Sequence, residues 1–173
     1  MKIRIVLLTL VVGFTISAFA ADARTSAPAG NAAVAFARLK SLVGEWEADT
    51  NMGKIQLTYE LTSGGHVLLE HVRVDSMHED MVTTYYLDGN QLVLTHYCEL
   101  GNRPHMVARK IDLGSGEIVF DFAGAGNLAS EKAEHMHSAV IRLMDDDHFS
   151  SAWTLFENAK PKLTVAAQYA RVK

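Results

Sequence analysis

Residues 81–98 read MVTTYYLDGNQLVLTHYC, two runs of β-forming side chains on either side of Asp88-Gly89-Asn90. A short turn that contains glycine between two such runs is a strong signal for a β-hairpin. A two-residue turn at Asp88-Gly89 or at Gly89-Asn90 places the same side chains on one face of the hairpin. That face carries Met81, Thr83, Tyr85 and Leu87 from the first strand and Leu92, Leu94, His96 and Cys98 from the second. Because the residues near the turn are large and apolar, we expect this face to look inward.

The same alternation of apolar and polar residues continues on both sides of this hairpin. It predicts further strands at residues 45–48, 54–61, 66–74, 105–111, 117–122, 136–144, 148–156 and 163–172. About ten short strands joined by tight turns indicate a mainly β protein. The short connections favour an antiparallel up-and-down β-barrel, and the alternative is an open antiparallel β-sandwich. The one long connection, Ala123–Glu134, is interpreted either as a short helix or as a loop over an opening.

One helix is predicted before the strands. Residues 33–43 place Val34, Leu39, Leu42 and Val43 at roughly helical spacing, and Gly44 follows as a suitable end of the helix.

The first twenty residues, MKIRIVLLTLVVGFTISAFA, have the composition of a secretory signal peptide. Lys2 and Arg4 precede an apolar stretch, and Ala18-Phe19-Ala20 is a typical cleavage motif. We therefore predict a signal peptide at 1–20, a flexible leader at 21–32, one β-barrel domain at 33–173, and a periplasmic or extracellular location.

Cleavage after Ala20 changes the charge of the chain. Fourteen of the 16 basic side chains then remain against 20 acidic ones, which gives a formal charge of −6. An acidic chain disfavours nucleic acid and anionic lipid as partners, and no stable membrane insertion is expected after cleavage. The single cysteine, Cys98, excludes a disulfide within the chain.

Two stretches carry a resemblance to known families. Residues 39–47, LKSLVGEWE, resemble the helix-then-Gly-x-Trp opening of lipocalin-like (calycin) β-barrels, which implies that Trp46 packs at the closed end of the barrel. Residues 81–104 resemble a group of exported bacterial β-barrels of unknown function that is distantly similar to haem-binding nitrobindin-like barrels. The nitrobindin-like axial histidine lies late in the chain, and 163–172 contains no histidine, so the resemblance does not imply a haem site.

These observations predict that the barrel binds a small apolar or amphipathic ligand in its lumen. The proposed lining is Tyr85, His96, Cys98 and Thr83, with Trp46 at the base. Arg103, in the turn before residues 105–111, either contacts a ligand carboxylate or fixes the turn. The sequence identifies neither a cofactor nor an oligomeric state.

The sequence is also compatible with several other kinds of site. His96 and Cys98, with one of His105, His135 or His137, form a candidate metal site, although the spacing matches no strong zinc signature. Glu70, if it faces inward, forms a candidate buried ion pair with Arg109 or Arg142. A haem protein, a small-molecule enzyme and a structural envelope protein with a filled barrel are the other possibilities. No G-x-S-x-G motif is present, and no catalytic residue is assigned.

Overall fold

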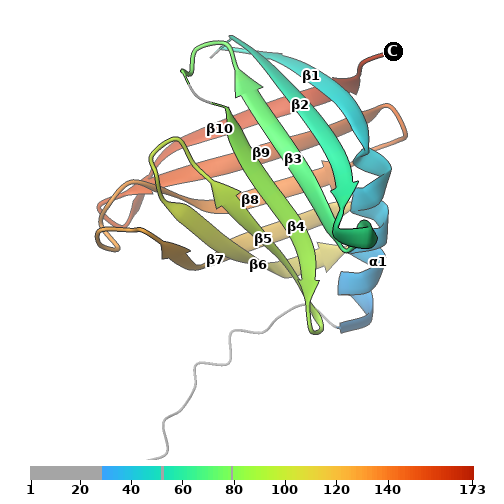
Figure 1. Ribbon diagram of the computed structural model, residues 1–173, viewed down its shortest axis with the longest axis horizontal. Helices are drawn as coiled ribbons and strands as arrows, with labels where there is room; N and C mark the ends of the chain where they lie inside the picture. The colour runs from blue at the N-terminus through green and yellow to red at the C-terminus, as the bar shows by residue number, and fades with distance from the viewer. Residues whose placement is uncertain (1–28, 52, 79) are drawn as a thin grey trace, which may run out of the picture.

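The computed structural model describes residues 29–51, 53–78 and 80–173, so the predicted signal peptide and most of the predicted leader lie outside the described residues. Ten antiparallel strands form a closed barrel in which each strand pairs with the next and β10 pairs with β1 (Figure 1). The strands are β1 (Gly44–Thr50), β2 (Gly53–Thr62), β3 (Val67–Val74), β4 (Met81–Asp88), β5 (Gln91–Tyr97), β6 (Arg103–Asp112), β7 (Glu117–Gly126), β8 (His135–Leu143), β9 (His148–Glu157) and β10 (Lys160–Arg171). The up-and-down barrel is confirmed, and the open sandwich is excluded.

The β4–β5 hairpin has its two-residue turn at Gly89-Asn90. Leu87 pairs with Leu92 and Tyr85 with Leu94, which is one of the two registers predicted. The first turn residue, Gly89, has φ +56°, a value that favours glycine at this position. The predicted inward face is buried from Met81 to Tyr85 and from Leu92 to His96, whereas Leu87, at the barrel end, is 38% exposed.

The N-terminal helix begins earlier than the sequence indicated. It consists of α1 (Ala29–Leu39) and a 3-10 turn, η1 (Lys40–Leu42), so four residues assigned to the leader are helical. Phe36, Leu39 and Leu42 are buried, whereas Val34 is exposed. The helix contacts β4, β5 and β6 at the barrel end that holds the β4–β5 turn, and it covers that end (Figure 1).

The long connection contains no helix. Strand β7 continues to Gly126, and residues 127–134 form a loop that leads into β8. The alternative of a short helix at 123–134 was therefore wrong, and the strand extends because residues 124–126 pair with the first residues of β6.

The barrel closes between β1 and β10, where Trp46 and Arg171 are register partners. The Arg171 guanidinium lies over the Trp46 ring at 4.1 Å from the ring centroid and donates to the carbonyls of Val43 (2.9 Å) and Ser41 (2.8 Å). The Trp46 indole donates to the Leu42 carbonyl at 2.7 Å. These bonds join both barrel edges to the end of the helix.

Gly116, in the β6–β7 turn, provides a test of the fold. It has φ +73°, and a Cβ at this position would lie 2.2 Å from the Leu143 carbonyl oxygen, whereas a Cβ at Gly89 meets no atom within 4 Å. We predict that Gly116→Ala lowers the free energy of unfolding by about 3 kcal/mol, from backbone strain and steric overlap together. The matched control Gly89→Ala adds backbone strain without steric overlap and should lower the free energy of unfolding by about 1 kcal/mol. Urea unfolding of the two variants measures the difference, and equal losses would contradict the assigned packing of this turn.

Candidate functional site

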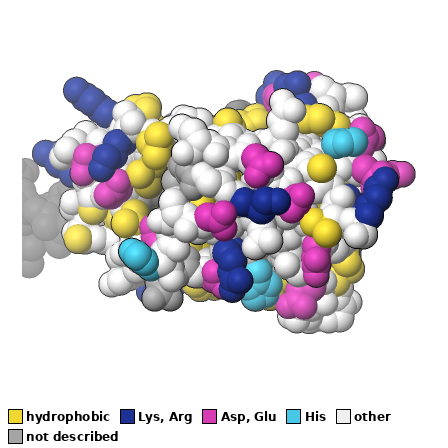
Figure 2. Space-filling model, turned by 90° about the horizontal axis from the view of Figure 1, so that it is seen from above, with side chains coloured by type: hydrophobic (Ala, Val, Ile, Leu, Met, Phe, Trp, Pro, Cys, Tyr) yellow, Lys and Arg dark blue, Asp and Glu magenta, His cyan; other side chains and the backbone are white. Residues whose placement is uncertain are grey.

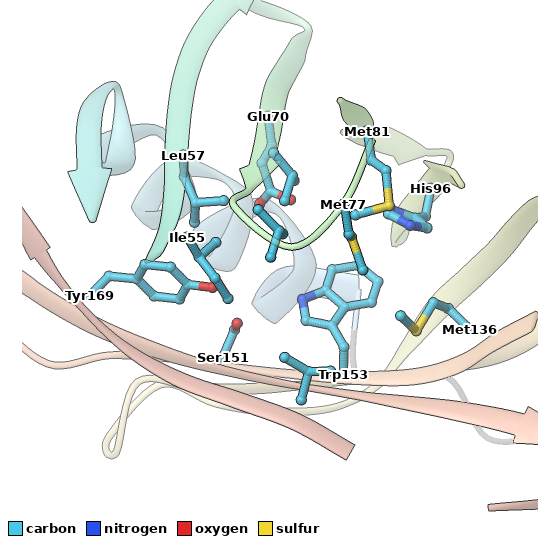
Figure 3. A pocket seen from close by; sticks show the side chains of 13 residues that line it. Ile55, Leu57, Glu70, Met77, Met81, His96, Met136, Ser151, Trp153 and Tyr169 are labelled. Atoms are coloured by element: carbon cyan, nitrogen blue, oxygen red, sulfur yellow. The ribbon is translucent and has the colours of Figure 1, made fainter. Parts of the chain in front are cut away.

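A cavity of about 60 Å³ remains inside the barrel, toward the end opposite α1 (Figure 3). Its lining is mainly apolar and comes from β2, β3, β4, β5, β8, β9, β10 and the β3–β4 connection. The lining residues are Ile55, Leu57, Glu70, Val72, Val74, Met77, Met81, His96, Met136, Ser151, Trp153, Val165 and Tyr169. The rest of the lumen is filled by large buried side chains such as Tyr85, Phe120 and Phe149. The barrel is therefore largely filled, with one small space at the end away from the helix.

Glu70 is the buried acidic group of this cavity, and its side chain is held by hydroxyl groups. Its Oε2 accepts a hydrogen bond from Tyr59 and another from Tyr85 at 2.9 Å, and the side chain also bonds Thr83. Burial raises the pKa of Glu70, and the three hydrogen bonds act against that rise. Burial and the nearby Glu70 raise the pKa values of Tyr59 and Tyr85 well above the ordinary value, so both remain protonated donors.

Thr83 connects Glu70 to His96. Thr83 pairs with Glu70 on one side and with His96 on the other, and its Oγ1 lies 3.0 Å from His96 Nδ1. While Glu70 is ionised it can only accept, so Thr83 donates to Glu70 and accepts from the Nδ1–H of His96. This order of donors leaves Nε2 of His96 without a proton, as an acceptor.

His96 Nε2 is buried and has no hydrogen-bond partner in the described part of the chain. The residue is 4% exposed, and its burial lowers the pKa to about 4. It therefore remains neutral at neutral pH. An unpartnered buried acceptor carries a cost of about 1–3 kcal/mol, which a bound group with a donor would remove.

Sulfur and aromatic groups surround His96. Its ring centroid lies 5.2 Å from that of Trp153, and Met77, Met81 and Met136 line the same cavity (Figure 3). The alternation along β4 predicted that Met81 faces the inside of the barrel. Met77 and Met136 were missed, because Met77 lies in a connection and Met136 lies beside an irregularity in the β8–β9 register.

The structure brings three of the six predicted ligand-binding residues together. Thr83, Tyr85 and His96 are linked around Glu70, but only His96 lines the cavity. Cys98 is half-buried just beyond β5 and does not line the cavity, and burial raises the pKa of its thiol.

The other two predicted residues lie elsewhere. Trp46 is 1% exposed and packs edge-on against Phe149, with ring centroids 4.9 Å apart, in the core rather than on the cavity wall. Arg103 is exposed at the start of β6, and its guanidinium lies against Gly126.

The predicted metal set does not converge. His105 bonds Thr95 at 3.3 Å, on the strand face opposite to that of His96. His135 and His137 bond each other at 3.0 Å, and His137 stacks between Phe122 and Phe156. Across the residues that the structure describes, no group of three or more His, Cys, Asp or Glu side chains could hold a metal ion.

The predicted arginine partners of Glu70 were also wrong. Arg109 lies 4.0 Å from Asp121, and Arg142 pairs with Glu117. The alternation along β3 correctly placed Glu70 inside the barrel. The two arginines pair away from Glu70, because their carboxylate partners lie elsewhere: Asp121 is exposed, and Glu117 lies at the start of β7. Tyrosine hydroxyls take the place of a cation.

On the face seen in Figure 2, basic and acidic side chains are interspersed. Over residues 29–51, 53–78 and 80–173, no helix combines the length and the apolar character that a membrane crossing requires.

Comparisons with known proteins support no family assignment. No family model matches the sequence, which leaves the lipocalin-like and nitrobindin-like resemblances without support, and no curated protein matches it. A solved structure of a protein of unknown function from the DUF3598 family of Nostoc punctiforme is similar at a TM-score of 0.40 and 11% identity. The match covers 78% of this chain and 48% of that one, so this chain spans about half the length of that protein.

The low pKa of His96 predicts a pH-dependent stability. The folded pKa of about 4 lies below the ordinary 6.5, so the unfolded chain binds a proton more readily, and stability falls as the pH drops from 6.5 to 4. At ~1.36 kcal/mol per pKa unit, protonation of His96 lowers the free energy of unfolding by about 3 kcal/mol across this pH range. Urea unfolding of the wild type and His96→Gln at several pH values isolates this contribution, since all other titrating groups are shared. The same pH slope in both proteins would show that His96 is not buried in its neutral form.

Proposed function

We propose that this protein is an exported β-barrel that binds one small, mainly apolar molecule with a hydrogen-bond donor in the cavity beside His96. The observation that carries the proposal is the unpartnered Nε2 of His96, a residue that lines a mainly apolar cavity. A few placed polar groups in an apolar pocket are typical of small-molecule sites. His96 stays neutral at neutral pH, and while Glu70 is ionised Thr83 accepts from its Nδ1–H, so the ligand supplies the proton of the hydrogen bond to Nε2.

The size of the cavity limits the ligand. The cavity measures about 60 Å³, whereas an apolar cavity that binds benzene measures about 150 Å³. A ring-sized ligand therefore requires side chains to move. Met77, Met81 and Met136 line the space and can do so, since methionine has three rotatable side-chain bonds and adapts to irregular shapes. Methionine sulfur and the Trp153 ring also favour contact with an aromatic ligand.

Phenol and anisole form a matched pair of probes for this site. Phenol can donate to His96 Nε2 and anisole cannot, so we predict that phenol binds more tightly to the wild-type protein. His96→Leu should weaken phenol binding by about tenfold, the loss expected for one hydrogen bond, and should leave anisole binding nearly unchanged. Titration calorimetry measures both affinities. His66→Leu, at an exposed position, is the control and should bind phenol as the wild type does.

Two results would contradict the proposed binding mode. One is no binding of either probe at millimolar concentration. The other is equal phenol affinity in the wild type and His96→Leu, which would place the ligand outside the cavity.

The proposed export rests on residues 1–20. Expression of the full chain in a Gram-negative host should yield a periplasmic protein whose intact mass corresponds to residues 21–173. A chain that starts at Ala21 after an initiator methionine is the control and should stay in the cytoplasm. Recovery of the uncleaved mass from the cytoplasm alone would exclude the proposed location.

A further inference from the structure

We propose that the cavity also binds one soft monovalent metal ion, Cu⁺ or Ag⁺, through His96 Nε2 and the thioether sulfurs of Met77 and Met81. This inference goes beyond the proposed function, because it requires neither an apolar ligand nor an enlarged cavity. The two proposals share a space and are tested by different probes.

The donor atoms decide which class of ion the cavity can take. Thioether sulfur is a soft ligand that prefers Cu⁺, and imidazole nitrogen accompanies it readily. Calcium and magnesium prefer several oxygen ligands, whereas the lining offers one carboxylate, and that group is already bonded to three hydroxyls. The absence of a group of three His, Cys, Asp or Glu side chains among the described residues argues against zinc and does not bear on a thioether site.

The strand register brings the nitrogen and one sulfur together. Thr83 lies directly across from His96, and Met81 lies two residues before Thr83 on the same face of β4. Met81 is therefore the diagonal neighbour of His96, a position that a long side chain can bridge. Met77 enters from the β3–β4 connection and lines the same small cavity (Figure 3).

Charge supplies an independent argument for a cation. Glu70 lines the cavity, and in the described part of the chain its side chain bonds the hydroxyls of Tyr59, Tyr85 and Thr83 rather than a positive group. An uncompensated buried carboxylate is costly. A monovalent ion in the adjacent space would neutralise that single charge, and the Trp153 ring beside His96 provides a further surface that attracts cations.

Silver nitrate in chloride-free buffer is the probe for this site, because Ag⁺ has the ligand preferences of Cu⁺ without its redox chemistry. The Cys98→Ser variant is the background for every measurement, since a free thiol also binds Ag⁺. Native mass spectrometry should show one bound Ag⁺, and titration calorimetry should give its affinity. In this background, Met77→Leu and Met81→Leu should each weaken binding by at least about tenfold, as even outer-sphere changes do at metal sites. Both changes conserve volume, and thermal unfolding checks that the variants fold.

Met144→Leu is the matched control, because Met144 is 49% exposed and lies outside the cavity. Its Ag⁺ affinity should equal that of the Cys98→Ser background. The ¹⁵N chemical shift of His96 Nε2 should change on addition of Ag⁺, as direct coordination requires. No bound Ag⁺ in the Cys98→Ser protein, equal affinities in the Met77, Met81 and Met144 variants, or an unchanged Nε2 shift would each overturn the proposal.

The outcomes separate this proposal from the proposed function. Phenol binding without Ag⁺ binding overturns only the ion site, and Ag⁺ binding without phenol binding overturns only the small-molecule site. If both bind, saturation with Ag⁺ should abolish phenol binding, because the two occupy one cavity.

Discussion

A buried carboxylate without a cation is the constraint on which the interior of this barrel depends. Glu70 is 4% exposed, and burial of an ionised carboxyl costs several kcal/mol unless donors surround it. The donors come from the neighbouring strands, since Tyr59 on β2 and Thr83 on β4 are its direct register partners. A slip of one residue in either pairing would turn these side chains outward and leave Glu70 unbonded. The carboxylate therefore ties β2, β3 and β4 to a single register.

The closure of the barrel is what keeps that carboxylate out of water. The ladder between β1 and β10 has two register pairs, Trp46 with Arg171 and Glu47 with Ala170, so backbone pairing alone joins these edges over a short length. Arg171 adds side-chain bonds to the carbonyls of Ser41 and Val43 and covers the Trp46 ring. Helix α1, which leads into these residues, closes the same end, so the remaining space lies at the other end of the barrel.

Strand alternation predicted most of the fold and part of the site. The turn at residues 88–90 fixed the parity of its two strands, and parity alone was enough to place Thr83, Tyr85 and His96 inside. The contacts of Glu70 were not predictable in this way, because they depend on which strands are neighbours and at what offset. Cys98 shares the parity of His96 but follows the last residue of β5, where the alternation no longer positions a side chain. Met77 carries no periodic signal at all.

The ionisation of Glu70 determines what the cavity can accept. Ionised Glu70 orders the hydrogen bonds so that Thr83 accepts from Nδ1 of His96 and Nε2 keeps its lone pair. If Glu70 took up a proton and donated a hydrogen bond to Thr83, the order of donors and acceptors would reverse. Thr83 would then donate to Nδ1 of His96, and Nε2 would carry the imidazole hydrogen. The cavity would then present a donor and could neither accept a hydrogen bond from a phenol nor coordinate a metal ion. The three hydroxyl donors around Glu70, which oppose the effect of burial on its pKa, are therefore the feature of the sequence that sets the chemistry of His96.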